Sequence, residues 1–355
     1  LRVRPLLIPG AVLVPFVVNI SVISQAGTAV AVGTVLVPLL RSARLSSLTI
    51  AAALALGSSL GGEQLNPGAP EVNTIATTSK SAPADCVQRV APVLLLQLAV
   101  ALAVFWPICL RAEARNAVTA QPSMEEKAAN LTPFHVSPFK AVVPAIPVLL
   151  LMVVGPPFSL FEVPRDWLAD AGTSPTTFGA RLVGVSMLFG SALASLTKPR
   201  SAGLAASSFF EGAGLAVTRI ISIIVVATCF GKGIEELKFD EPIRDAIAGR
   251  EELVWPIAGS LTLLFALLCG SGMAATQSLY RFFVTPGMST ETMLRVGGVV
   301  AVTAAAGRTM SPVAAVNLVS ADLTDTEAIA IARRVALPML VASAVTIGVA
   351  WWRGG

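Results

Sequence analysis

Long apolar runs, separated by shorter polar stretches, follow one another along almost the whole chain. A helix needs about 20 apolar residues to cross a hydrocarbon core of about 30 Å, and several runs reach that length. The pattern therefore predicts an all-α membrane protein that crosses the bilayer many times. The predicted helices cover residues 5–23, 28–40, 45–76, 90–110, 141–161, 178–197, 203–230, 253–268, 273–285, 292–320 and 335–352.

Two pairs of these runs differ from ordinary membrane spans. Run 5–23 is followed at once by 28–40, and run 253–268 by 273–285, with only short tips of small residues between them. Two of these arms are too short to cross the bilayer, so we predict that each pair is a re-entrant hairpin. Non-helical backbone at membrane depth is tolerated where it is buried in protein or lines a wet cavity.

Charged residues indicate how the hairpins are oriented, because basic residues gather on the cytoplasmic side of membrane proteins. Arg2 and Arg4 precede the first hairpin, and Arg41 and Arg44 follow it, so we expect its base to be cytoplasmic. The segment 232–252 carries more acidic than basic residues, so we expect the second hairpin to open outward. The two hairpins would then enter from opposite sides.

An internal repeat supports this symmetry. Segments 62–69 and 307–314 both fit the pattern G-x-x-x-[N/S]-P-x-A and are displaced by 245 positions, since 307 − 62 = 245. The same displacement carries Gly27 in the first tip onto Gly272 in the second. Inverted repeats with interrupted helices that meet at the midplane are the sequence sign of a secondary-transporter site. We therefore predict two broken helices, 45–76 and 292–320.

The repeat also predicts that part of the architecture is missing. Three spans (141–161, 178–197 and 203–230) precede the second hairpin, and none precedes the first. Symmetry therefore predicts that at least three N-terminal scaffold helices are missing, and the start at Leu1 rather than Met agrees with this expectation. The alternative is a truly asymmetric protein.

The expected organisation combines these elements into two repeats. We predict first-repeat transport elements over 1–110, a cytoplasmic connector over 111–140, scaffold helices of the second repeat over 141–230, an extracytoplasmic amphipathic segment over 231–252 and second-repeat transport elements over 253–352.

Composition agrees with a membrane protein and excludes several other classes. Hydrophobic residues make up 54% of the chain and charged residues 13%, about half the share in soluble proteins. The single histidine, His135, excludes a multi-histidine metal site, and the four cysteines show no CxxC spacing, so we expect no cofactor. No basic block points to nucleic acid, and no G-x-x-x-x-G-K-[ST] motif points to nucleotide hydrolysis.

Four motifs, in order, resemble one known family. Segments 57–71, 210–214, 269–273 and 306–313 are similar to the DcuC-type family of anaerobic C4-dicarboxylate carriers. The resemblance implies membership of the ion-transporter superfamily, whose members are typically homodimers in the inner or plasma membrane. It also implies a fixed scaffold domain and a transport domain that moves like an elevator. We expect the sequence to depart from this family's pattern, because the first scaffold helices are predicted to be missing.

The hairpin tips and broken helices offer the chemistry that a dicarboxylate needs. Helix N-termini and unpaired N–H groups attract anions, while unwound carbonyls and hydroxyls can coordinate Na⁺. Serine and threonine in such places can also simply satisfy neighbouring backbone groups, so both interpretations stay open. The candidate substrate-binding residues are Ser24, Gln25, Gly27, Thr28, Asn66, Pro67, Ser271, Gly272, Thr276, Arg308, Thr309, Ser311 and Pro312. The candidate coupling-ion residues are Ser24, Ser58, Ser59, Glu63, Asn66, Ser271 and Ser311.

Two charged residues at midspan are the sharpest signal. Glu63 and Arg308 are related by the same displacement of 245 and lie in the two broken helices. Each costs roughly 2.5–3.5 kcal/mol at the bilayer centre, which makes it a functional candidate. In one hypothesis Arg308 anchors a substrate carboxylate and Glu63 binds the coupling cation or proton. In the other, the two form a salt bridge that joins the halves.

The sequence thus favours a secondary carrier of C4-dicarboxylates such as succinate, fumarate or malate. Cation symport, with Na⁺ or H⁺, or exchange would drive it. The alternatives are a carrier of another organic anion on the same scaffold and a membrane sensor that does not transport. An intramembrane enzyme is disfavoured, because His135 lies in a predicted loop and no G-x-S-x-G motif is present.

Overall fold

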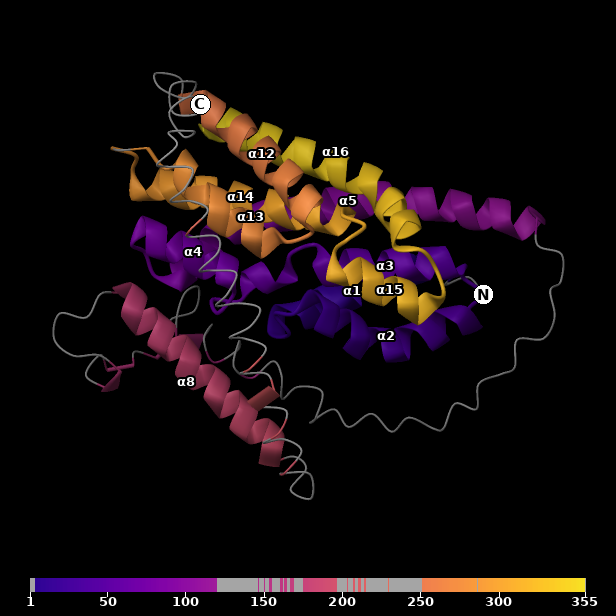
Figure 1. Ribbon diagram of the computed structural model, residues 1–355, viewed down its shortest axis with the longest axis horizontal. Coiled ribbons are helices and arrows are strands. Elements are labelled where there is room, and N and C mark those ends of the chain that lie inside the picture. Colours follow the sequence, from indigo (N-terminus) through magenta and orange to yellow (C-terminus); the bar gives the residue numbers. More distant parts are fainter. Residues whose placement is uncertain are drawn as a thin grey trace.

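The described part of the protein is helical throughout. The computed structural model describes residues 4–119, 175–196, 251–285 and 287–354, with scattered positions between 146 and 229 (Figure 1). Within these ranges there is no strand. Three helical stretches there are long and apolar enough to cross a membrane: Pro83–Arg115, Thr290–Thr324 and Ala328–Gly354. An all-helical chain with such stretches is compatible with a membrane protein.

The first half begins with a helical hairpin. Helix α1 spans Arg4–Ser21 and α2 spans Gln25–Ser42. Ser24 ends the turn between them: its backbone is extended, and its side chain accepts a hydrogen bond from the N–H of Gly27. This is an N-cap, which satisfies one of the donors that the first turn of a helix leaves unpaired.

A helix interrupted near its middle follows this hairpin. Helix α3 (Ser47–Ser59) gives way to the short 3₁₀ helix η1 (Gly62–Leu65) and then to α4 (Pro70–Ser79). The interruption begins at Gly61, whose φ of 116° lies in the left-handed region that side-chain-bearing residues rarely adopt. Pro70 is the first residue of α4, where the missing N–H of proline costs nothing because the first N–H groups of a helix have no intrahelical partner.

The second half contains corresponding elements in the same order. After η6 (Glu251–Leu253), helices α12 (Val254–Cys269) and α13 (Gly272–Leu279) form the second hairpin. A 3₁₀ turn, η7 (Tyr280–Phe283), ends its second arm. The second interrupted helix consists of α14 (Thr290–Met310) and α15 (Ala315–Thr324).

The two interrupted helices resume in the same way at positions 245 residues apart. Helices α4 and α15 are both ten residues long, and both end at a non-glycine residue with positive φ, Lys80 (57°) and Asp325 (54°). The hydroxyls of Ser79 and Thr324 each donate to the carbonyl four residues earlier, at 2.7 Å. Equivalent sequence positions therefore adopt equivalent local structure.

The hairpin tips do not follow the same displacement. Ser271 caps α13 by accepting from the N–H of Ala274, as Ser24 caps α2, and these two caps are 247 positions apart, since 271 − 24 = 247. Gly27 is the third residue of its helix, whereas Gly272 is the first. The predicted equivalence of these two glycines is therefore wrong by two residues.

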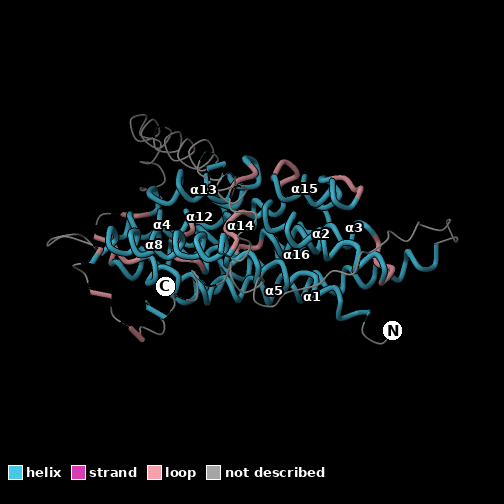
Figure 2. The backbone as a smooth tube through the Cα atoms, turned by 90° about the horizontal axis from the view of Figure 1, so that it is seen from below, coloured by secondary structure: helices cyan, strands magenta, loops and turns pink. Residues whose placement is uncertain are grey.

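The hairpins approach the middle of the molecule from opposite ends. Figure 1 shows α1 and α2 at the end that carries the N-terminus, and α12 at the end that carries the C-terminus. Figure 2, from a perpendicular direction, shows the same division, with α2, α3 and α15 on one side and α4, α12 and α13 on the other. Helices α5 (Pro83–Thr119) and α16 (Ala328–Gly354) pack against each other and run past both halves.

Several predicted boundaries differ from the structure. Helix α5 extends well beyond the predicted 90–110, into the segment assigned to the connector, and α16 begins before the predicted 335. The reason is that Arg111 and Arg333 lie on polar turns of helices that continue past their apolar stretch. Helix α8 (Pro175–Leu196) occupies the predicted run 178–197. The predicted helices 141–161 and 203–230, most of the segment 231–252 and the connector from residue 120 on lie outside the described residues.

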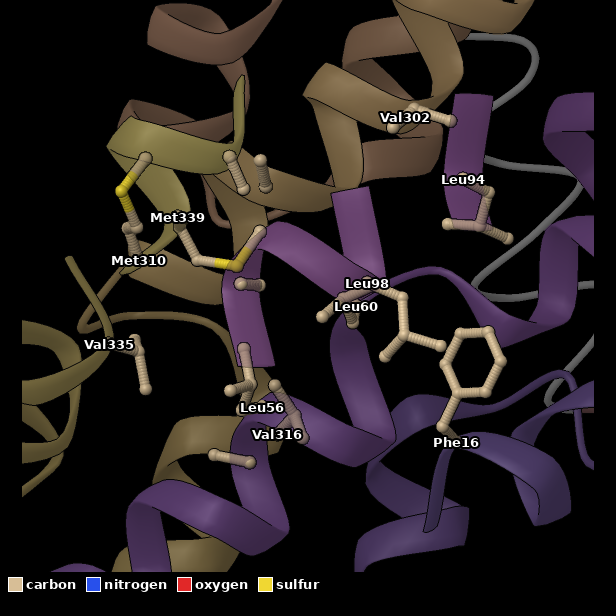
Figure 3. Packing of buried hydrophobic residues seen from close by; sticks show 14 of the residues in the cluster. Phe16, Leu56, Leu60, Leu94, Leu98, Val302, Met310, Val316, Val335 and Met339 are labelled. Atoms are coloured by element: carbon tan, nitrogen blue, oxygen red, sulfur yellow. The ribbon is translucent and has the colours of Figure 1, made fainter. Parts of the chain in front are cut away.

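Close backbone approach holds the hairpins against the interrupted helices. A Cβ added at Gly57 or Gly62 would lie 2.3 or 2.5 Å from a carbonyl oxygen of α1. A Cβ added at Gly307 in α14 would lie 2.2 Å from the carbonyl oxygen of Leu263 in α12. The first arm of each hairpin, α1 or α12, therefore contacts the interrupted helix of its own half at a glycine, as closely packed membrane helices commonly do. Around these contacts lies a core of buried hydrophobic residues, including Phe16, Leu56, Leu60, Leu94, Leu98, Val302, Met310, Val316, Val335 and Met339 (Figure 3).

Candidate functional site

A buried ion pair lies where the two interrupted helices meet. Arg308, in the last turn of α14, donates from Nη2 to Oε1 of Glu63 in η1 at 2.8 Å. The side chains are 6% and 0% exposed. Glu63 and Arg308 therefore form a salt bridge between the two halves in this structure, as one of the two hypotheses expected. A role in binding substrate or ion remains a prediction.

Ser59 fixes the orientation of the guanidinium. Arg308 donates from Nη2 to the Ser59 carbonyl at 2.7 Å and from Nε to the Ser59 Oγ at 3.1 Å. The hydroxyl of the neighbouring Thr309 also lies 3.0 Å from that carbonyl, and 2.7 Å from the carbonyl of Ala305 in its own helix. The carbonyl is available because Ser59 is the last residue of α3, where carbonyls no longer receive an intrahelical hydrogen bond. The break in the first helix thus creates the acceptor that orients the arginine of the second.

A second carboxylate lies on the other side of the guanidinium. Glu71, in the first turn of α4, has Oε1 3.8 Å from Arg308 Nη1 and is 2% exposed. The sequence reasoning did not select Glu71, although it lies in the predicted run 45–76. A carboxylate within a predicted membrane span is the signal that could have identified it.

The tip of the first hairpin reaches this ion pair through polar side chains. Gln25, in the first turn of α2, donates from Nε2 to Glu63 Oε1 at 2.9 Å. Asn19, near the end of α1, accepts from the backbone N–H of Glu63 at 3.1 Å. Asn66, just after η1, donates to the carbonyl of Ile20 at 3.0 Å. Asn19 was missed because one amide in an apolar run carries no repeat or charge signal.

The tip of the second hairpin reaches the pair through its backbone. A Cβ on Gly272 would lie 3.2 Å from Arg308 Nη1 and 3.3 Å from the carbonyl of Ala304. The first residue of α13 therefore packs directly against the guanidinium. Gly270, with a φ of 69°, makes the turn that brings it there. Each tip thus contacts one member of the ion pair: the first tip contacts Glu63 and the second contacts Arg308.

Other predicted site residues are placed in three different ways. Ser24 and Ser271 serve as N-caps, and the Thr28 hydroxyl donates to the carbonyl of Val22 at 3.1 Å. Pro67 lies in the turn after η1 and Pro312 in the turn after α14. The hydroxyls of Ser58, Thr276 and Ser311 are buried and have no hydrogen-bond partner among the described residues, as is also true of Glu63 Oε2.

The buried oxygens without a hydrogen-bond partner bear on which ligands could bind here. Within the described ranges no group of three or more His, Cys, Asp or Glu side chains could hold a metal ion. Hydroxyl and carboxylate oxygens without a partner remain suitable for a small monovalent cation or a proton, because buried polar atoms without partners are costly. The centre therefore combines one cationic group and two carboxylates with one unpaired carboxylate oxygen, Glu63 Oε2.

Part of the chain is similar to a known protein. A Haemophilus influenzae protein named "Putative uncharacterized transporter" is 28% identical over 204 residues, which cover 57% of this chain and 68% of that protein. The likeness supports a transporter function. No protein-family model and no solved structure matches the chain. Together with the apolar helices, the likeness indicates a membrane protein that transports.

Proposed function

We propose that this protein is a secondary carrier of small C4-dicarboxylates, such as succinate, fumarate or malate, with the site between the hairpin tips and the interrupted helices. The observation that carries the proposal is Arg308, a buried cation that the second hairpin tip contacts directly and that is paired with Glu63, which the first hairpin tip contacts. An ionisable residue at such depth, at a meeting point of broken helices, is typical of a transport pathway.

The donors around Arg308 suit a carboxylate ligand. Nη2 and Nε are already engaged by Glu63 and Ser59, whereas Nη1 donates no hydrogen bond within the described residues. Helix α13 begins beside Nη1, and the positive end of a helix dipole favours a nearby anion. Helices α2, α4 and α15 also begin in the middle region (Figure 1). A carboxylate there would meet one guanidinium nitrogen and several helix N-termini.

The charge count supports cation symport over simple exchange. Glu63, Glu71 and Arg308 together carry one net negative charge when all are ionised. A dicarboxylate would add two more, and uncompensated charge in a buried site is strongly disfavoured. We therefore propose that cations enter with the substrate. Candidate ligands for them are Glu63 and the buried hydroxyls of Ser58 and Ser311.

The matched geometry of the halves supports an inverted-repeat carrier. Helices α4 and α15 share length, capping and hydroxyl hydrogen bonds at a displacement of 245. The sequence motifs resemble DcuC-type carriers, for which an elevator movement, a homodimer and an inner-membrane location are expected. We propose the same for this protein.

Uptake of radiolabelled succinate into proteoliposomes tests the proposal. The full-length protein is expected to take up succinate, to be competed by fumarate, and to depend on an imposed cation gradient. Arg308→Lys keeps the positive charge but lacks the planar guanidinium group that can donate two hydrogen bonds to a carboxylate, so uptake should fall at least tenfold. Arg295→Lys, at a partly exposed position thirteen residues earlier on the same helix, is the matched control. Uptake that survives in the Arg308 variant at the control level would refute the anchoring role.

One observation favours a second candidate, a carrier of an organic anion with a single carboxylate. Arg308 is the one buried cation that the described residues place in this site, and one guanidinium suits one carboxylate. Competition by monocarboxylates that exceeds competition by fumarate would favour this candidate. Absence of uptake for every anion tested, from folded protein, would leave the sensor alternative.

A further inference from the structure

Three charges share the buried centre, and they are not equivalent. Glu63 accepts from Arg308 Nη2 at 2.8 Å and from Gln25 Nε2 at 2.9 Å, both at Oε1. One oxygen of Glu63 therefore has two side-chain donors within hydrogen-bond distance. Glu71 faces the same arginine at 3.8 Å, which is beyond hydrogen-bond distance. No other side chain in the described ranges donates to it, although its own backbone N–H in the first turn of α4 does. Arg308 therefore neutralises Glu63 and leaves Glu71 without a counter-charge of its own.

Among the described residues, no further charge reaches Glu71 from the helices that pack against α4. Glu63 and Arg308 are the charged groups that act on it. Helix α13 carries no charged residue, and α8 contributes Arg181, which donates to the carbonyl of Leu168. Near the ends of α5 and α14 that lie beside α4, the charged residues are Asp85, Arg89, Glu291 and Arg295. Arg89 pairs with Glu291 at an exposed position, and Arg295 donates to the carbonyl of Arg353.

We propose that Glu71 is the proton-binding site of this carrier and that the proton it holds is exchanged during transport. This proposal rests on the proposed transport function and deepens it. With one proton on Glu71, the ion pair of Glu63 and Arg308 is neutral and the whole centre carries no net charge. With Glu71 ionised, the centre carries an unpaired negative charge in a water-poor site, which is the costlier state.

The geometry also gives the order of events. Arg308 Nη1 points to Glu71 on one side and lies beside the first residue of α13 on the other. An ionised Glu71 competes with a substrate carboxylate for this nitrogen, and a protonated Glu71 does not. Proton uptake at Glu71 therefore favours substrate binding, and substrate departure favours proton release. The step transfers only a proton between solvent and the Glu71 carboxylate and breaks no other bond.

Infrared spectroscopy on the purified full-length protein tests the site without any substrate. A buried protonated carboxyl group gives a C=O stretching band that ionised carboxylates lack. The wild-type protein is expected to show such a band at neutral pH and to lose it at alkaline pH. Glu71→Gln should remove the band, Glu71→Asp should shift it, and Glu291→Gln, the same change at an exposed position, should leave it unaltered. A band that persists in Glu71→Gln would overturn the proposal.

Transport measurements test the coupling. For one proton bound with each substrate, the apparent affinity should weaken by about tenfold per pH unit as pH rises through the titration. This slope should flatten in Glu71→Gln, while exchange of external for internal substrate continues, because glutamine imitates the protonated acid. Uptake in the wild type that needs Na⁺, ignores pH and is lost in Glu71→Gln would assign a sodium ion to the site and overturn the proton.

The two proposals can fail separately. If succinate is not transported but the Glu71 band is present and titrates, the substrate proposal fails and the proton site stands. If succinate is transported with an unchanged pH dependence in Glu71→Gln, the proton site fails and the carrier function stands.

Discussion

The contact between α12 and α14 at Gly307 gives a prediction whose size follows from the structure. A Cβ at this position would lie 2.2 Å from the Leu263 carbonyl oxygen, 2.8 Å from the Ala266 Cβ and 2.9 Å from the Leu267 amide nitrogen. Two of these atoms belong to backbone and cannot rotate away. Because ordinary contacts begin near 3.4 Å, Gly307→Ala must move the first arm of the second hairpin from α14 by about 1 Å.

The free-energy change has two parts of opposite sign. Replacing glycine by alanine inside a helix stabilises it by about 0.5–1 kcal/mol. Forcing an extra methyl group into a packed contact costs about 1–3 kcal/mol. Gly298→Ala provides the matched control on the same helix, because its nearest neighbour would be the Arg89 carbonyl oxygen at 3.5 Å, an ordinary contact. Both variants share the helix gain, so the difference between them, about 1–3 kcal/mol, measures the contact alone.

Thermal unfolding in detergent is the assay. Each kcal/mol corresponds to about 2–4 °C in a large domain, so Gly307→Ala should unfold about 2–12 °C below Gly298→Ala. Gly298→Ala should unfold at or slightly above the wild-type temperature. Equal midpoints for the two variants would refute the backbone contact between α12 and α14 as described.

Two further predictions concern the hydrogen bonds at the ion pair. Gln25→Ala removes the donor that joins the first hairpin tip to Glu63, so amide hydrogen exchange at the start of α2 should become faster. Exchange at the wild-type rate would show that this hydrogen bond does not stabilise the hairpin tip. Thr309→Val removes a hydroxyl that lies 3.0 Å from the Ser59 carbonyl as well as 2.7 Å from the Ala305 carbonyl of its own helix. It should lower the free energy of unfolding by about 0.5–1.5 kcal/mol more than Thr303→Val, whose hydroxyl bonds only within its own helix.

The parts of this architecture that the sequence could predict are those that depend on local pattern. Apolar runs predicted the helices, and the repeated glycine and proline motif located both interruptions. The displacement of 245 also related Glu63 to Arg308, which the structure places 2.8 Å apart. Repeated motifs carry this information because equivalent segments of a repeat occupy equivalent positions in space.

Other features depend on three-dimensional detail that no local pattern carries. Both hairpin tips consist of small residues, so a glycine match at 245 looked correct, and only the capping hydrogen bonds of Ser24 and Ser271 show the shift of two residues. The Ser59 carbonyl became an arginine ligand because α3 ends at that residue. Glu71 remained unselected because its repeat partner, Val316, is apolar, so the symmetry argument passed over it.

The sequence separation between Glu63 and Arg308 has a consequence for biosynthesis. Ribosomes add about 5–20 residues per second, so Arg308 is made roughly 10–50 s after Glu63, by which time the first hairpin has met the membrane. Until then the nascent first half holds two acids and no arginine to complete its centre. The newly made half must therefore keep Glu63 and Glu71 near water until the last quarter of the chain arrives, and a chain that stops before Arg308 leaves both carboxylates without the arginine that lies between the two halves.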